Sequence, residues 1–134
     1  MIKRLAIITM LTPIWAIGVS LPRAEAAELV MFEQDGCVWC AKFNAEIAPG
    51  YANSEEGRIA PLRRVDIHGE IPQDLAGIPI EHFTPTFVLV EDGEELGRIR
   101  GYPGSEFFWF LVDELIAKLP EQEKTSVPEK SPAL

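Results

Sequence analysis

Cys37 and Cys40, three positions apart, carry the clearest chemistry in this sequence, which holds no other cysteine. A mostly apolar stretch at 28–33 and a polar turn at 34–36 precede them, and apolar residues recur with helical spacing after them. The pair is therefore expected where a strand gives way to a helix. There, unpaired N–H groups and the positive end of the helix dipole would stabilise a thiolate at Cys37 and lower its pKa.

This placement predicts thiol–disulfide exchange in two steps. Cys37 attacks a disulfide of the substrate and forms a mixed disulfide with it. Cys40, expected one turn deeper on the buried face of the helix, stays protonated until it resolves that bond. Both residues are the predicted catalytic groups.

Other uses of the pair are weaker alternatives. A c-type haem site needs histidine directly after the second cysteine, where Ala41 stands. A zinc site needs two more ligands, and His68 and His82 lack ligand-like spacing; we assign these histidines no role. A purely structural disulfide would close too small a loop to stabilise the fold much. We expect no metal and no cofactor.

The N-terminal residues 1–26 are typical of a secretory signal peptide. Lys3 and Arg4 precede an apolar stretch at 5–21, and residues 24–26 match the small-residue pattern before a cleavage site. An uncleaved membrane anchor is the alternative. We therefore expect an exported protein, with a single domain at 27–120. The charged, proline-containing segment 121–134 is predicted to be a disordered tail.

The chain's formal net charge of −9 argues against nucleic acid as a partner, because a phosphate backbone would be repelled. Within the domain, apolar patterning predicts four strands, at 28–33, 62–67, 86–90 and 94–100. One helix follows the cysteines and ends or kinks at Pro49–Gly50; residues 51–60 are ambiguous, and 68–83 are irregular with a short helix near 72–76. This order indicates an α/β fold, a mixed four-stranded sheet with helices on both faces.

Several local features of the second half of the domain are also predicted. Asp92–Gly93 suits a two-residue hairpin turn, and Gly97 suggests a bulge in the return strand. Ser105 is the expected N-cap of a last helix, which runs to Leu119. Its buried stripe should consist of Phe108, Val112, Leu115 and Leu119. Trp109 and Phe110 are expected to cover the sheet edge, with an interaction patch as the alternative.

Taken together, these motifs resemble the thioredoxin superfamily over nearly all of 27–120. They are the strand–turn–CxxC–helix unit, Thr84-Pro85-Thr86-Phe87 before a central strand, Asp92-Gly93 and Gly101-Tyr102. The resemblance implies a thioredoxin-like fold in which Pro85 is cis and faces the cysteines, and in which Thr84 offers backbone hydrogen bonds to a substrate peptide. Trp39, expected to be exposed beside Cys37, is a further candidate for substrate contact.

The stretch 32–40 is more narrowly similar to the periplasmic thioredoxins of bacterial sulfur-oxidation operons, the SoxS type. That similarity implies a periplasmic location and a reductase of a periplasmic sulfur-carrier protein, fed by a membrane thiol electron transporter. A monomer is expected. Val38–Trp39 replaces the usual Gly-Pro between the cysteines, so the redox potential does not carry over. Met31 stands where many thioredoxins bury an aspartate; Glu33 is a possible substitute, although a strand-end carboxylate is the favoured interpretation.

Three functions are consistent with the sequence. The favoured one is reduction of disulfides, or of cysteine-linked sulfur adducts, in an exported protein. A disulfide-forming oxidase is the first alternative, but oxidising relatives usually carry a sizeable helical insertion for which this chain has no room. The second alternative is a non-catalytic thioredoxin-fold binding module with a permanent disulfide.

Overall fold

A computed structural model of the protein describes residues 26–121 and Lys124. The signal peptide expected at 1–26 and the tail expected at 121–134 lie outside these residues, except for Ala26, Glu121 and Lys124. The elements follow in the order β1 (Glu28–Glu33), α1 (Val38–Glu46), α2 (Ala48–Tyr51), α3 (Glu55–Ile59), β2 (Leu62–Asp66), η1 (Gln73–Leu75, a 3₁₀ turn), β3 (Thr86–Glu91), β4 (Glu94–Arg100) and α4 (Ser105–Ile116).

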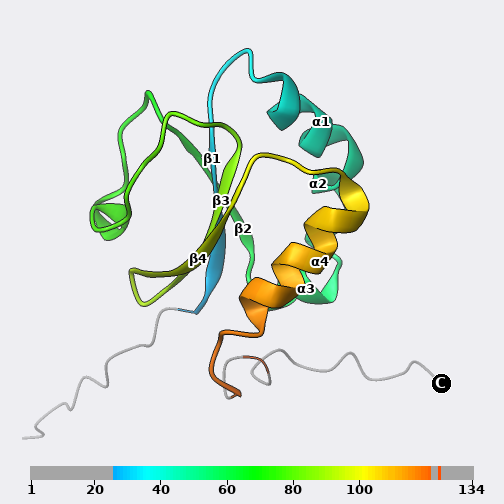
Figure 1. Cartoon of the computed structure of the whole chain (residues 1–134). Coiled ribbons are helices and arrows are strands. Elements are labelled where there is room, and N and C mark those ends of the chain that lie inside the picture. Colours follow the sequence, from blue (N-terminus) through cyan, green and yellow to red (C-terminus); the bar gives the residue numbers. More distant parts are fainter. Residues whose placement is uncertain (1–25, 122–123, 125–134) are drawn as a thin grey trace, which may run out of the picture.

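The four strands form one mixed sheet in the order β2-β1-β3-β4 (Figure 1). β1 runs parallel to β2, while the β1–β3 and β3–β4 pairs are antiparallel. β1 and β3 are therefore the two inner strands. Covered on both faces, they read as continuous apolar runs in the sequence. The predicted mixed four-stranded sheet is confirmed.

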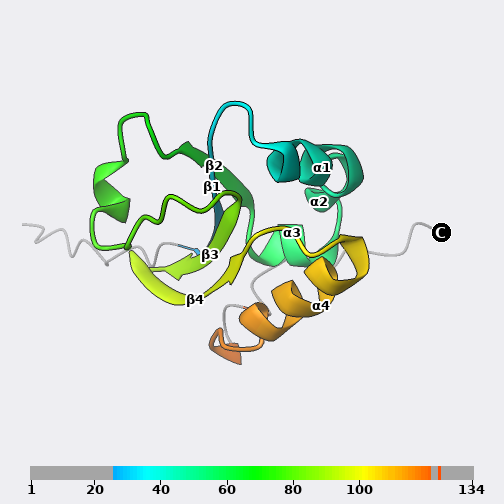
Figure 2. The same ribbon diagram turned by 45° about the horizontal axis from the view of Figure 1, so that its top comes forward.

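Side chains that alternate along the inner strands divide the core into two layers, one on each face of the sheet. On one face, Leu29, Met31, Phe87 and Leu89 pack against the α-helices. On the other, Val30, Phe32, Val88 and Val90 pack against Leu75 and Ile78 of the segment between β2 and β3. Helical structure thus lies on both faces but unequally, with α1–α4 on one side and η1 on the other (Figure 2).

The β3–β4 hairpin follows the prediction closely. Asp92 and Gly93 form its turn with φ of 50° and 75°, the left-handed pair that a two-residue hairpin requires. Further along, Leu89 pairs with Gly97 while Val90 pairs with Glu95. One extra residue of β4 is therefore left between these pairs, which is the bulge expected at this glycine.

The start of α4 differs from the prediction. Gly104, not Ser105, is the N-cap, and Ser105 is the first helical residue. Gly104 has φ of 98°, a conformation that glycine adopts without steric cost, so the chain turns into the helix one residue earlier. The regular helix ends at Ile116, and Leu119 is held by a following turn. The predicted stripe, Phe108, Val112, Leu115 and Leu119, is buried.

Trp109 and Phe110 do not cover the sheet edge, and that expectation was wrong. The Trp109 ring stacks on Tyr51 of α2 at 5.8 Å between centroids and 12° between planes. Phe110 is 58% exposed. Because Phe108 and Val112 already face the sheet, neighbouring positions of the helix point toward α2 or toward solvent.

The close packing of α3 against the end of α2 predicts a large difference between two glycine substitutions. A methyl carbon at Gly57 would lie 1.8 Å from the carbonyl oxygen of Tyr51, whereas one at Gly50 meets nothing within 4 Å. Gly57→Ala is therefore expected to lower the free energy of unfolding by about 3 kcal/mol. Gly50→Ala should change it by less than about 1 kcal/mol. Urea denaturation of both variants checks this, and equal midpoints would contradict it.

A second prediction concerns the acidic contact between α3 and α4. Burial, followed by the negative charge of Glu56, raises the pKa of Asp113. A carboxyl whose pKa is higher in the folded protein costs stability above that pKa, and the cost disappears as pH falls below it. Asp113→Asn should therefore stabilise the protein at pH 7 by a few tenths of a kcal/mol, since the group is largely exposed. The gain should vanish in acid, as followed by urea denaturation.

Glu114→Gln, which neutralises the next residue of the same exposed stretch of α4, is the matched control for general charge effects. A gain from Asp113→Asn that keeps its size in acid would show that Asp113 is not destabilised by its charge.

Candidate functional site

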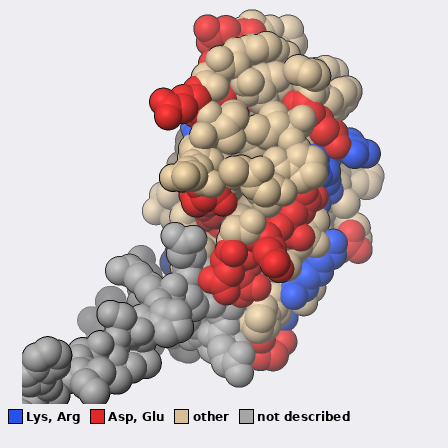
Figure 3. Space-filling model, turned by 90° about the vertical axis from the view of Figure 1, so that its left-hand side faces the viewer, with Lys and Arg blue, Asp and Glu red and all other residues tan. Residues whose placement is uncertain are grey.

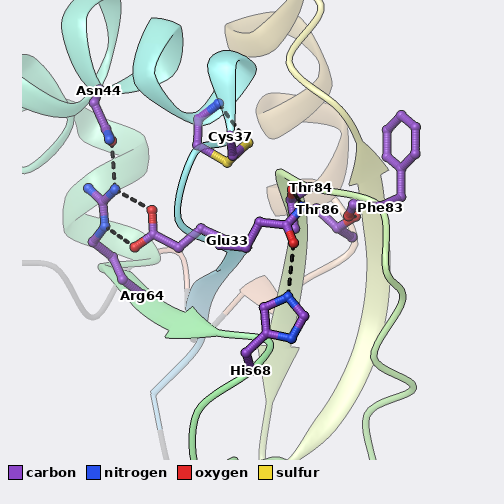
Figure 4. The surroundings of a disulfide bond; sticks show 10 residues. Glu33, Cys37, Asn44, Arg64, His68, Phe83, Thr84 and Thr86 are labelled. Carbon is purple, nitrogen blue, oxygen red and sulfur yellow. Dashed lines mark hydrogen bonds and ion pairs between the residues drawn. A yellow bond between two sulfur atoms is a disulfide. The ribbon is translucent and has the colours of Figure 1, made fainter.

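Three loops meet at one end of the sheet. In the strand register, Glu33 of β1 pairs with Asp66 of β2, and Phe32 pairs with Thr86 of β3. The loop after β1, the loop after β2 and the loop before β3 consequently leave the same edge side by side. Figure 4 shows the result: Cys37, His68 and Thr84 all lie in the surroundings of the disulfide.

Cys37 occupies the N-cap of α1, and its sulfur accepts a hydrogen bond of 3.1 Å from the backbone N–H of Cys40. The two residues form a disulfide with their Cα atoms 5.2 Å apart. The pair therefore stands at the strand-to-helix junction that the sequence predicted. The same N–H group and the helix dipole would stabilise a thiolate at Cys37 after reduction, because both favour negative charge at that atom.

The two cysteines differ in their access to solvent. Cys40 is only 3% exposed and belongs to the core cluster that includes Phe43, whereas Cys37 is partly exposed at the margin of that cluster. A substrate can therefore reach the sulfur of Cys37 more readily than that of Cys40. Beside the pair, an open hollow of about 460 Å³ is lined by Glu33, Gln34, Asp35, Gly36, Cys37, Val38, Cys40, Ala41, Asn44 and Asp66.

The bond between Thr84 and Pro85 is cis, as the resemblance implied. Two hydrogen bonds hold the loop that contains Thr84 and Pro85. The Thr86 hydroxyl donates to the carbonyl of Phe83 at 2.6 Å, and the N–H of Gly101 donates to the carbonyl of Pro85 at 2.7 Å. The start of β3 thus holds this loop at the same end of the sheet as the cysteines.

Comparison with solved structures finds a close relative. The crystal structure of the periplasmic thioredoxin SoxS from Paracoccus pantotrophus, in its reduced form, shares 47% sequence identity with this chain. The match covers 69% of this chain and 97% of that one, with a TM-score of 0.64. This chain belongs to the SoxS-type thioredoxins. Neither a protein-family model nor a curated protein matches the sequence.

Family membership confirms the predicted fold class and the predicted activity class: the protein is a thioredoxin-like thiol–disulfide oxidoreductase. At this thioredoxin's site, Trp39 is 54% exposed, as expected from its helical phase. The ammonium group of Lys42 lies 5.6 Å from the Trp39 ring centroid, within the range of a cation–π contact. The ring is therefore partly held in place and still accessible.

Glu33 is engaged in an ion pair. Arg64 donates to its carboxylate through Nε at 2.8 Å and through Nη2 at 2.6 Å, and also reaches the Asn44 amide oxygen at 2.7 Å (Figure 4). The contact raises the pKa of Arg64, with the hydrogen bond to Glu33 as the main cause. This arrangement agrees with the interpretation of Glu33 as a strand-end carboxylate. It joins β2 to α1 beside the hollow.

Gln34 and His68 make contacts beside the disulfide that the sequence did not predict. The Gln34 amide nitrogen donates to the Thr84 hydroxyl at 2.9 Å, and its amide oxygen lies 3.0 Å from Nε2 of His68. The separations along the chain are 50 and 34 residues, so no local pattern reports them. The only signal in the sequence was the position of Gln34 directly after an inner strand. A residue there has loops of two neighbouring strands beside it.

On the face of the thioredoxin that carries η1, Asp and Glu side chains are scattered among uncharged residues, with Lys and Arg at one margin (Figure 3). No lysine or arginine occurs between Arg64 and Arg98 in the sequence, a stretch that contains Glu70, Asp74 and Glu81 among other acids. Within residues 26–121 and 124, no three His, Cys, Asp or Glu side chains are grouped to hold a metal ion. In the same residues, no helix has the length and apolar character needed to cross a membrane.

Proposed function

We propose that this SoxS-type thioredoxin works as a periplasmic reductase in which Cys37 attacks and Cys40 resolves. The observation that carries the proposal is the unequal setting of the two sulfurs. Cys37 is accessible and accepts an N–H hydrogen bond at the helix N-terminus, while Cys40 is buried in the core. A thiolate is favoured at the first position and disfavoured at the second.

In the proposed reaction, the Cys37 thiolate attacks one sulfur of a disulfide in the partner protein and expels the other as a thiolate. A mixed disulfide then links Cys37 to the partner. The Cys40 thiol loses its proton and attacks the Cys37 sulfur, which releases the second partner thiolate. The partner gains two electrons, and its two thiolates take up the proton released by Cys40 and one from solvent. The thioredoxin ends with the Cys37–Cys40 disulfide. In a cysteine-linked sulfur adduct, the S–S bond of the adduct takes the place of the disulfide, and its two sulfur-containing parts leave as anions, one at each attack.

Two further observations support the direction and the location. Between β2 and β3 the described chain contains η1, of three residues, as its helical element, whereas oxidising relatives usually carry a larger helical insertion. The relative SoxS is a periplasmic protein, which agrees with a signal peptide at 1–26. We further propose that a membrane thiol transporter supplies the electrons, and that Trp39, Thr84 and Pro85 contact the partner, a sulfur-carrier protein.

The direction can be tested by the redox state of the pair. Acid quenching of cells followed by alkylation should find Cys37 and Cys40 mostly as thiols if a donor keeps the protein reducing. A mostly oxidised pair with a high reduction potential would instead identify an oxidase. A disulfide that resists dithiothreitol would identify a binding module.

The partner can be captured through the missing second step. Cys40→Ala should accumulate a mixed disulfide between Cys37 and the partner in periplasmic extracts, and mass spectrometry of the complex then identifies that protein. Cys37→Ala is the matched control and should capture nothing. Equal capture by both variants would overturn the assignment of roles.

A further inference from the structure

The side chain of Gln34 spans the three loops around the disulfide. Its amide nitrogen donates to the hydroxyl of Thr84 at 2.9 Å, and its amide oxygen lies 3.0 Å from Nε2 of His68. Because an amide oxygen only accepts, Nε2 of His68 must carry the hydrogen of that bond. The three side chains thus form a directed chain of hydrogen bonds from His68 through Gln34 to Thr84. Figure 4 draws the bond at His68 as a dashed line.

The strand order explains why one side chain can reach both neighbours. β1 lies between β2 and β3 in the sheet, and Gln34 is the first residue after β1. The loop after β2 therefore lies on one side of it and the loop before β3 on the other. A side chain of the length of glutamine bridges this span with one acceptor and one donor end.

The His68 end of the chain is anchored independently of Gln34. The backbone N–H of His68 donates to the Asp66 carboxylate at 2.9 Å, and the N–H of Ile67 donates to the carbonyl of Glu33 at 3.0 Å. The backbone of His68 is consequently held just after the end of β2, while its side chain is exposed. Its bond to the amide oxygen orients the Gln34 amide so that the nitrogen faces Thr84.

We propose that Gln34, oriented by His68, is a positioning residue that holds Thr84 and Pro85 in place to receive the main chain of a polypeptide disulfide beside Cys37. This inference rests on the proposed function, in which the Thr84–Pro85 loop contacts the substrate. The Gln34 side chain bonds to that loop, while Cys37 meets Gln34 through the backbone. Its loss should therefore weaken recognition of polypeptide substrates and leave the reactivity of the sulfur unchanged.

The test compares two disulfides of different size on the purified, prereduced protein. Gln34→Met keeps the side-chain length and removes both hydrogen bonds. Its rate constant against the interchain disulfides of insulin should fall by about fivefold to tenfold, the equivalent of one good hydrogen bond. Its rate constant against bis(2-hydroxyethyl) disulfide, which has no peptide chain to dock, should stay within about twofold of wild type.

Matched variants separate positioning from general damage. Gln73→Met makes the same chemical change at an exposed residue of η1, and should alter neither rate. Gln34→Glu retains acceptors for His68 and for the Thr84 hydroxyl, and should restore most of the insulin rate. Thr84→Val should reproduce the selective loss, and combining it with Gln34→Met should add little, since both variants lose the bond between Gln34 and Thr84.

A substitution at His68 tests its role in orienting Gln34. His68→Phe should lose insulin reduction selectively, by less than Gln34→Met because the bond to Thr84 is only loosened.

Two results would overturn the inference. Equal slowing of both disulfides by Gln34→Met would place its effect on Cys37 itself or on folding, and unchanged rates with both would show that the bridge has no role. Failure of the proposed function has a different signature, because the Cys37–Cys40 pair would then be mostly oxidised in cells or would resist dithiothreitol, whatever the two rates of the variants.

Discussion

Replacing Cys37 by serine is expected to lower the steady-state rate of disulfide reduction by at least on the order of 10³-fold. Serine fits the N-cap and accepts the N–H of Cys40 as the sulfur does, so the helix should still form. What is lost is the nucleophile, because a hydroxyl is almost fully protonated at neutral pH. The remaining thiol of Cys40 is buried, so we expect it not to attack a folded partner.

The stoichiometry of thiol release gives the sharpest measurement of these roles. A chromogenic aromatic disulfide releases one coloured thiolate at the first attack and a second when the mixed disulfide is resolved. Prereduced wild-type protein should therefore release two thiolates per molecule, Cys40→Ser one, and Cys37→Ser almost none on the same timescale. A rapid release of one thiolate by Cys37→Ser would show that Cys40 can attack by itself.

The largest expected loss of stability follows from Phe108→Ala. Phe108 is fully buried, and its ring lies 5.2 Å from that of Phe43 and 4.9 Å from that of Phe87, measured between centroids. It also contacts the rings of Tyr102 and Trp109 at 6.0 and 5.8 Å. Removal of this ring leaves a cavity where α1, α4 and the sheet meet, so the free energy of unfolding should fall by about 4 kcal/mol.

Phe107→Ala is the matched control, since Phe107 precedes Phe108 on α4 and is 67% exposed. It should change the free energy of unfolding by less than about 0.5 kcal/mol. Guanidinium denaturation, followed by tryptophan fluorescence, measures both variants. Similar losses for the two would show that Phe108 does not anchor the core as its burial indicates.

The sequence predicted those parts of the structure that depend on local pattern. The inner strands, the helix after the cysteines and the Asp92–Gly93 turn each have a period or a turn residue of their own. The start of α4 was missed by one residue, because Ser105 is a common N-cap and Gly104 competes with it through its left-handed φ. The position of Phe110 was predicted wrongly, because the sequence around an apolar residue next to a buried stripe does not show whether that residue is covered or exposed.

The site was predictable to a different degree. The junction at Cys37 and the cis bond before Pro85 followed from a motif and from family resemblance. The roles of the two cysteines stay predictions until the kinetic experiments are done. The bridge from Gln34 to His68 and Thr84 depends on strand order and register, which join residues far apart in the chain. A single sequence carries no periodicity that reports such contacts.

The two outer strands of the sheet have a consequence for the behaviour of the protein at high concentration. On β2, Arg63 and Arg64 form ion pairs with Glu28 and Glu33. On β4, the ammonium group of Lys118 donates a hydrogen bond to the carbonyl of Leu96 at 3.3 Å, next to the bulge. An irregular, charged border is a poor template for a strand from another molecule. We expect the protein to remain dispersed in a crowded compartment rather than to assemble edge to edge into fibrils.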